Sequence, residues 1–301
     1  MATNDPSRVP PQSPRAPIQG HLDSPAPAVN VQVQFGARSW HGPRRAVNDD
    51  HYLVIRLGRS QETVITSLPE GAVPQRFDEF AYGMVIADGL GRAGEAASRL
   101  AVTTLAELAI HFGKWNVRID ERTAEEVMRR GEAYYKDVDL TLAQASSEGG
   151  PQLEAAMTAV YTAGAELFFV HVGHSRAYLF RDGALLQMTR DHTLASGDDH
   201  AATTTSLGDT ARDLHHRLTE TIGRVGAPPR IDIERLGLLD GDIILLCSNG
   251  LTDIIDEDLI ADELRMPRTP DEHCRALITL AIQGHAGDDV TAVIARYSIP
   301  E

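Results

Sequence analysis

Oxygen-bearing side chains stand at the ends of apolar runs in four separated segments of the chain. They are Asp49 with Asp50, Asp88, Asn249 with Asp253, and Asp288 with Asp289. Hard divalent cations prefer oxygen ligands, keep several waters and are often held by carboxylates from different strands. Two such ions bridged by one carboxylate would polarise a water between them into a nucleophile. If the strand ends meet, the pattern favours metal-assisted hydrolysis.

The stretch around Asp88 shows how one of these acids is positioned. The apolar run 85–87 is typical of a buried strand, and Gly89 and Gly91 follow where the backbone must turn. A helical pattern then covers 93–113, with apolar residues at i, i+3, i+4 and i+7. Asp88 is therefore expected at a strand end. A strand followed by Asp-Gly is also typical of an ordinary turn, so the metal interpretation depends on the other acids.

The remaining patterns predict a mainly antiparallel β domain with several helices. Further strands are expected at 31–35, 51–57, 81–87, 159–162, 167–172, 177–180, 185–188, 231–233, 242–247 and 290–297. The four strands between residues 155 and 188 are expected to form one meander. Helices are expected from Thr123 onward, where Thr-x-x-Glu has the form of a capping box, at 251–255, at 270–283, and as a weaker candidate at 209–222. The polar stretch 58–80 is expected to be a long hairpin loop or a small excursion, and 191–228 a flap or surface excursion.

The composition narrows the class of protein. The 301 residues carry 43 acidic and 28 basic side chains, a formal charge of −15, and no basic block. This argues against nucleic acid or an anionic membrane as a partner, because basic clusters supply affinity for both. No run of about 18 apolar residues and no hydrophobic signal core is found, so a cytoplasmic protein without a membrane partner is expected.

The domain boundary and the cysteines give two further expectations. Residues 1–29 are rich in proline and poor in large apolar side chains, which is typical of a disordered tail. One folded domain is expected at 30–299. Cys247 and Cys274 lie in apolar surroundings without Cys-x-x-Cys spacing, so they are interpreted as buried free thiols in a reducing compartment.

Five motifs in order give the chain a resemblance to a known family. They are Arg45-x-x-x-Asp49-Asp50, Asp88-Gly89-Leu90-Gly91 with Gly94-Glu95-x-Ala97-Ser98, Gly173-His174-Ser175-Arg176, Ser248-Asn249-Gly250-Leu251-x-Asp253, and Asp288-Asp289-Val290-Thr291. Over roughly residues 31–297 the chain resembles the PPM/PP2C metal-dependent serine/threonine phosphatases, in particular the bacterial branch. The resemblance implies an α+β fold, a four-layer α-β-β-α sandwich of two antiparallel sheets flanked by helices. It also implies two Mn²⁺ or Mg²⁺ ions at one rim.

The resemblance also implies roles for particular residues. Asp88 would bridge both ions, and the carbonyl of Gly89 and the side chain of Asp49 would serve the second ion. Asn249 and Asp288 would complete the shell of the first ion. By the same motif positions Arg45 would hold the substrate phosphate, a role that suits a planar, permanently charged fork, and Asp253 would be an outer-shell acid.

Several positions depart from the family pattern. Asn249 and His174 stand where the family has aspartates, and both changes affect the same ion and a third, weaker metal position. Asp49 replaces the usual glutamate, and Leu90 stands where some relatives carry a general acid. The third metal site is therefore expected to be absent or altered. His171 and His174 invite a zinc interpretation, but residues three apart on a strand point to opposite faces, so structural roles are favoured.

Three functions follow from this combination. The first is a metal-dependent phosphatase that acts on phosphoserine and phosphothreonine of a protein substrate, opposes a serine/threonine kinase and works as a monomer. The second is a pseudophosphatase, a binding or regulatory module in which Asn249 and His174 have impaired metal binding. The third is a hydrolase of small phosphoesters, which would be indifferent to phosphopeptides.

Overall fold

Two five-stranded antiparallel sheets form the centre of the computed structural model, which describes residues 31–112, 119–147, 151–196 and 217–299. Sheet A has the strand order β1-β10-β9-β6-β7 and sheet B the order β2-β3-β4-β5-β8. The strands of sheet A are β1 Gln32–Trp40, β10 Val290–Ser298, β9 Ile243–Cys247, β6 Arg176–Arg181 and β7 Ala184–Gln187. Those of sheet B are β2 Asp50–Glu62, β3 Arg76–Leu90, β4 Glu154–Ala163, β5 Glu166–Val172 and β8 Asp232–Gly237.

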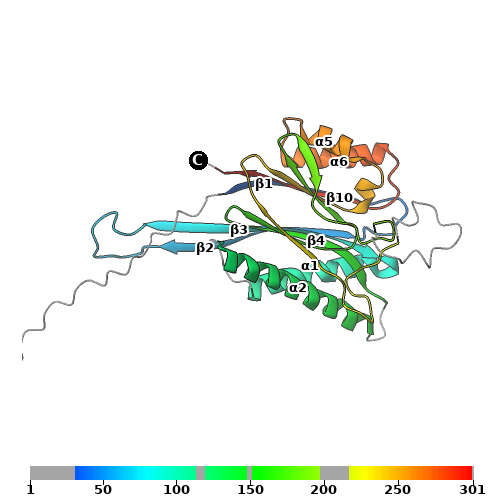
Figure 1. The fold of residues 1–301 in the computed structure, drawn as a ribbon, viewed down its shortest axis with the longest axis horizontal. Helices are drawn as coiled ribbons and strands as arrows, with labels where there is room; N and C mark the ends of the chain where they lie inside the picture. The colour runs from blue at the N-terminus through cyan, green and yellow to red at the C-terminus, as the bar shows by residue number, and fades with distance from the viewer. Residues whose placement is uncertain (1–30, 113–118, 148–150, 197–216, 300–301) are drawn as a thin grey trace, which may run out of the picture.

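Helices cover the outer face of each sheet, as Figure 1 shows. The long helices α1 Gly94–Phe112 and α2 Glu121–Ser147 pack on sheet B, and a short 3₁₀ helix Gly91–Ala93 leads into α1. The helices α4 Asn249–Thr252, α5 Glu257–Leu264 and α6 Pro270–Gln283 pack on sheet A. The expected four-layer α-β-β-α sandwich is therefore confirmed.

Strand β9 shows how sequence alternation builds the layers. All five of its residues are buried. Ile244 and Leu246 point into the apolar layer between the two sheets, whereas Ile243, Leu245 and Cys247 point to the layer beneath α4, α5 and α6. Successive side chains of a strand face opposite sides, so this one apolar run contributes side chains to both apolar layers. Cys274 of α6 lies in the same layer as Cys247, and both cysteines are free, buried thiols, as expected.

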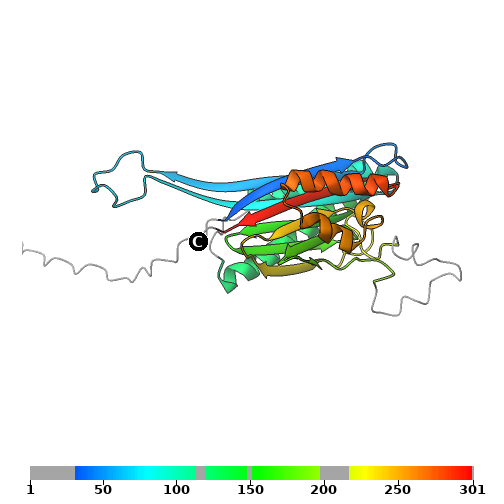
Figure 2. The same cartoon turned by 90° about the horizontal axis from the view of Figure 1, so that it is seen from above.

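The polar stretch 58–80 is the expected hairpin loop only at residues 63–75, and its two flanks are strand. Strands β2 and β3 pair without interruption from Asp50 opposite Asp88 to Glu62 opposite Arg76. The resulting hairpin extends beyond the other strands in both views (Figures 1 and 2). Its outer half has no apolar alternation because neither face covers a core there, which is why the sequence pattern missed it.

The expected single meander is also wrong. Strands β4 and β5 pair in sheet B, and β6 and β7 pair in sheet A, so the chain changes sheets after β5. The change occurs at Gly173, which has a φ of +110° that favours glycine. A Cβ there would lie 2.4 Å from the Cβ of Ala156.

The helices differ from expectation in three details. α2 begins at Glu121 and its first turn is capped by Asp120, whose carboxylate accepts from the Thr123 backbone N–H at 2.7 Å. The expected cap at Thr123 is therefore wrong. At α6, whose range 270–283 is as expected, Thr269 and Glu272 form a capping box. α5 was not expected. Of the candidate helix at 209–222, residues 209–216 lie outside the described residues and 217–222 are not helical.

Two further expectations concern the N-terminal tail and the membrane. The proposed tail, 1–29, lies outside the described residues. Among the helices that the structure describes, none is both long enough and apolar enough to cross a membrane.

Candidate active site

Asp50 and Asp88 are partners in the antiparallel register of β2 and β3. Residues directly opposite each other on neighbouring strands carry their side chains on the same face, with Cβ atoms about 4.5–5.5 Å apart. Both aspartates are buried, at 5% and 6% relative exposure. Two carboxyl groups thus face one another at one end of sheet B, where the strand ends were expected to meet.

Asp289 ties the loop before β2 to the start of β10. Its carboxylate accepts from the backbone N–H of Gly42 at 2.7 Å and from that of Asp49 at 2.7 Å. The backbone N–H of Gly89 in turn donates to the carbonyl of Asp49 at 3.0 Å. These bonds bring together three of the acidic segments that are far apart in the sequence.

Arg45 lies between two of the acids. Its Nε donates to Asp288 Oδ1 at 2.7 Å, its second guanidinium nitrogen reaches Asp288 Oδ2 at 3.1 Å, and its third reaches Asp49 Oδ2 at 3.1 Å. These bonds to Asp288 raise the pKa of Arg45 further. Burial alone would raise the pKa of Asp288, but the hydrogen bonds and charge of Arg45 outweigh it, and the pKa is lowered. Arg45 is therefore a cation already positioned within the acidic cluster.

The buried acids at the centre are electrostatically costly. Burial raises the pKa of Asp50 to about 7, although hydrogen bonds from Ser248 and Thr291 favour its charged form. Burial and then the facing Asp50 raise the pKa of Asp88 well above its usual range. Carboxylates that face one another in a buried site do not both ionise without a compensating cation. The pair is therefore suited to a proton or a metal ion.

Gly89 permits the close approach of β3 and α1. A Cβ at Gly89 would lie 1.8 Å from the carbonyl oxygen of Gly94, at the first residue of α1. A Cβ at Gly94 would lie 2.8 Å from the Cγ of Asp49. The two glycines therefore let the start of α1, the end of β3 and Asp49 meet, which explains why the motif needs glycine at both positions.

His174 and Asn249, two of the positions that depart from the family pattern, contact different acids. His174, in the turn between β5 and β6, is buried with its Nδ1 4.0 Å from Asp88 Oδ2. Asn249, the first residue of α4, donates from Nδ2 to Asp253 Oδ2 at 3.3 Å. His174 thus faces the central acid, and the amide of Asn249 is directed to an exposed one.

The donors of the site match a hard divalent cation in chemical type, although they are not gathered around one point. One carboxylate oxygen of Asp50, Oδ2, is buried and makes no hydrogen bond within the described part of the chain, and oxygen donors are those that Mn²⁺ and Mg²⁺ prefer. Within that same part, no three or more His, Cys, Asp or Glu side chains are arranged to hold a metal ion together. The bonds of Arg45 to Asp49 and Asp288 are consistent with this, because they engage two of the expected ligands.

Two residues of the site were seen in the sequence without being assigned a role. Asp50 faces Asp88, and Asp289 holds the loop that carries Arg45. Strand β2 begins at Asp50, one residue before its expected start at His51. The alternation of side chains along β2 was the signal that could have identified Asp50, had the register with β3 been known.

His171 has the structural role that was favoured for it. Its Nε2 lies 3.1 Å from the carbonyl of Arg190 and its Nδ1 lies 2.8 Å from the hydroxyl of Thr158. With its proton on Nε2, a neutral imidazole donates to the Arg190 carbonyl, and its Nδ1 shares the Thr158 hydroxyl proton with the carbonyl of Ser175, to which that hydroxyl donates at 2.8 Å. Its ring centroid lies 4.9 Å from that of His192.

Comparison with known proteins identifies what this arrangement resembles. The family model described as protein phosphatase 2C matches residues 74–279. The serine/threonine protein phosphatase PstP of Mycobacterium tuberculosis is 30% identical over 273 residues, which cover 89% of this chain and 45% of PstP. The chain therefore spans about half the length of this relative.

Solved structures share the fold. A serine/threonine phosphatase of S. agalactiae superposes with a TM-score of 0.67 at 22% identity, covering 88% of this chain and 99% of that one. The catalytic domain of PstP in complex with two manganese ions superposes with a TM-score of 0.64 at 26% identity, covering 89% of this chain and 99% of that one.

Proposed function

The chain belongs to the protein phosphatase 2C family, and we propose that it hydrolyses phosphoserine and phosphothreonine in proteins with the help of Mn²⁺ or Mg²⁺. The observation that carries this proposal is the facing pair of Asp50 and Asp88 beside the guanidinium of Arg45. A buried pair of acids suits a divalent cation, and an arginine fork suits a phosphate. Binding of a divalent cation and binding of the substrate phosphate thus each have a matching group.

The residues that would hold the cations come from several elements. Asp88, the carbonyl of Gly89, Asp49, Asp288 and Asn249 are the proposed ligands, and the inward-facing carboxylate makes Asp50 an additional candidate. When bound, the cations would lower the pKa of a water and stabilise negative charge on the phosphoryl group. The chain's own contribution is to hold these oxygens at the end of the sandwich, where β2, β3 and β10 meet.

Arg45 would bind the phosphate of the substrate. Its side chain is 29% exposed, so the guanidinium is accessible while it pairs with Asp288. Two oxygens of a phosphate can accept two parallel hydrogen bonds from the guanidinium, as the two oxygens of a carboxylate do. We infer that a phosphate competes for Arg45 when Asp288 is engaged by a cation. The clamp of Asp289 on Gly42 keeps the loop that carries Arg45 in place.

The nature of the substrate is supported by the relatives. PstP carries the name serine/threonine protein phosphatase, which favours a phosphorylated protein over a small phosphoester. A kinase of serine and threonine would supply that substrate, and we propose that the protein opposes such a kinase as a cytoplasmic monomer.

The proposal is tested by Mn²⁺-dependent turnover of a phosphoaryl ester and of a phosphothreonine peptide. Wild type, Asp88→Ala and Asn249→Asp are compared in Mn²⁺ and after chelation of the metal. We expect turnover by wild type that chelation removes, and none by Asp88→Ala. We expect Asn249→Asp to bind Mn²⁺ more tightly, because it restores a negative charge beside the cation. Turnover of the ester with indifference to the peptide would support a small-phosphoester hydrolase instead.

A second function, that of a pseudophosphatase, is favoured by the two substituted positions. The amide of Asn249 bonds to Asp253, and His174 stands near Asp88 where the family has an acid. Under this alternative wild type would be as inactive as Asp88→Ala, and Asn249→Asp combined with His174→Asp would gain Mn²⁺-dependent turnover. Activity of wild type above that of Asp88→Ala contradicts the alternative.

A further inference from the structure

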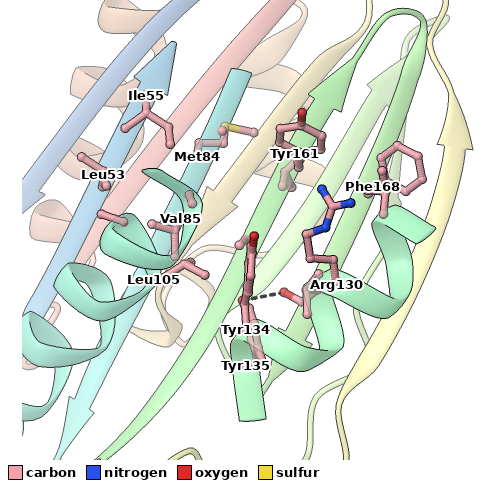
Figure 3. Close-up of a pocket in the computed structure, with 18 of the residues that line it drawn as sticks. Leu53, Ile55, Met84, Val85, Leu105, Arg130, Tyr134, Tyr135, Tyr161 and Phe168 are labelled. Atoms are coloured by element: carbon pink, nitrogen blue, oxygen red, sulfur yellow. Dashed lines mark hydrogen bonds between the residues drawn. The ribbon is translucent and has the colours of Figure 1, made fainter. Parts of the chain in front are cut away.

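A cavity lies between sheet B and the two helices that cover it, away from the acidic cluster (Figure 3). Its volume is about 140 Å³. Residues of β2, β3, β4 and β5 form its floor and residues of α1 and α2 its roof, among them Leu53, Val85 and Leu105. We call it the α1–α2 cavity. An apolar cavity of about 150 Å³ in another protein core accepts benzene, so this one has room for a single aromatic ring.

Small residues at facing positions leave this space. Ala106 and Ala109 of α1, Gly131 of α2, Gly83 of β3 and Ala159 of β4 all line it. Protein interiors are close-packed, and voids of this size lower stability. Larger side chains at Ala106 or Ala109 would fill the space without breaking the helix, since alanine and leucine both favour helices. The packing of the fold therefore does not itself require the cavity.

Polar groups gather at one side of the otherwise apolar wall. The hydroxyl of Tyr134 is buried and has no hydrogen-bond partner within the described residues. The neighbouring Tyr135, by contrast, donates its hydroxyl to the carbonyl of Val170 at 2.9 Å. Buried hydroxyl groups are ordinarily bonded. The hydroxyl of Tyr134 therefore has a hydrogen bond to donate, and a bound molecule with an acceptor atom could accept it.

The charge at this side of the cavity is balanced. Arg130 extends into the region of Tyr161 in Figure 3 and forms an ion pair with Glu126 at 2.8 Å. Arg130 also acts electrostatically on Tyr134 and Tyr161. Since the guanidinium already has a carboxylate partner, an uncharged acceptor suits the cavity better than a second anion, whose burial would lack a counter-charge.

We propose that the α1–α2 cavity is a binding site for an aromatic molecule of about benzene's size that carries one uncharged oxygen acceptor. The ring fills the apolar space beneath Ala106, and the oxygen accepts from the hydroxyl of Tyr134. The aromatic side chains of the wall offer edge and face contacts to such a ring. This site is independent of the proposed phosphatase activity, and its occupation is measurable without turnover.

The test uses the full chain and two fluorinated probes that differ only in the acceptor. Binding of 4-fluoroacetophenone, which has a carbonyl, and of 4-fluorotoluene, which lacks it, is followed by ¹⁹F NMR titration and by the shift in Tm. We expect both to bind wild type, the ketone roughly 2- to 10-fold more tightly, as one hydrogen bond contributes. In Tyr134→Phe the ketone should lose this advantage while 4-fluorotoluene binds as before.

Two variants that fill the cavity locate the site. Ala106→Leu and Ala109→Leu should abolish binding of both probes and leave the protein at least as stable. Ala133→Leu, the same change at an exposed position of α2, should bind both probes as wild type does. Unchanged binding in both filled variants, or no binding to wild type, overturns the proposal. Tighter binding of 4-fluorobenzoate than of the ketone overturns the uncharged class of ligand.

Discussion

Asp50 and Asp88 sit directly opposite each other in the register of β2 and β3, both buried. Because their carboxyl groups share one face, each raises the cost of ionising the other, and burial increases that cost. The same pair that destabilises the metal-free protein is the one that a divalent cation would stabilise. Removal of one of the two carboxylates should therefore stabilise the metal-free protein and weaken its binding of a divalent cation, and both effects can be measured.

Asp50→Asn should stabilise the metal-free protein and weaken its binding of Mn²⁺. Removing one carboxylate relieves the repulsion on Asp88, and we expect Tm in chelator to rise by roughly 2–4 °C, which corresponds to about 1 kcal/mol. Calorimetric titration should show Mn²⁺ binding at least about 10-fold weaker. The matched control is Asp137→Asn, at an exposed position of α2, which should change neither. A fall in the metal-free Tm of Asp50→Asn would contradict the repulsion.

Arg45→Lys should raise KM for a phosphate ester more than it lowers kcat. Lysine keeps the charge but loses the fork that holds two oxygens of Asp288 at once. We expect a rise in KM of roughly 10-fold, equivalent to about 1.4 kcal/mol, measured by steady-state kinetics at saturating Mn²⁺. Arg59→Lys, on the exposed hairpin far from the site, serves as the control. A change in kcat alone would assign Arg45 to another role.

Gly89→Ala should disrupt the start of α1 and the site together. The added Cβ would lie 1.8 Å from the carbonyl oxygen of Gly94, so backbone must move, and overpacking of this kind costs about 1–3 kcal/mol. We expect a lower Tm by calorimetry together with weaker Mn²⁺ binding. Gly237→Ala, where a Cβ meets nothing within 4 Å, should leave both unchanged. An intact Tm in Gly89→Ala would show that the turn tolerates a side chain.

Acid should destabilise the fold through His171. Burial, and then the nearby His192, lowers the pKa of His171 from 6.5 to about 3. The unfolded chain accepts a proton near pH 6.5 while the folded protein does not, so the unfolded state binds more protons between these values. The stabilising contribution is complete above pH 6.5 and is lost as pH falls toward 3.

Urea unfolding of metal-free protein at several pH values between 7.5 and 4 measures this effect. We expect the free energy of unfolding of His171→Gln to decline less steeply with acid than that of wild type. The control is His285→Asn, at an exposed position with a φ of 63° that asparagine tolerates. Equal slopes for wild type and His171→Gln would mean that other groups dominate the acid response.

The layers of the fold were predictable because period-2 alternation and buried apolar runs are local signals. Strands such as β9 and the helix α6 with its Thr269 cap therefore lie where the patterns put them. The outer half of the β2–β3 hairpin was not predictable, since residues 58–62 of β2 are all exposed and the buried position facing them on β3 is the polar Glu79. The change of sheet at Gly173 was missed as well, because strand pairing depends on tertiary contacts.

The site was predictable at the level of segments and less so at the level of atoms. The resemblance brought Asp49, Asp88 and Asp288 to one rim, and the structure places all three segments together. It is the register of β2 against β3 that sets Asp50 opposite Asp88, and a shift of one residue would exchange Asp50 for Asp49. The hydrogen bonds of Arg45 to Asp49 and Asp288 could not be predicted, because the spacing of residues along the sequence does not give distances between side-chain atoms.

The pairing of β1 with β10 joins parts of the site that are far apart in the sequence. Arg45 follows β1, whereas Asp288 and Asp289 directly precede β10, and these two strands pair along Gln32–Trp40 and Val290–Ser298. Without this pairing the chain lacks both the clamp on the Arg45 loop and one proposed ligand. Folding of sheet B alone sets Asp50 opposite Asp88 but does not complete the proposed site, whose assembly is therefore tied to the long-range closure of sheet A.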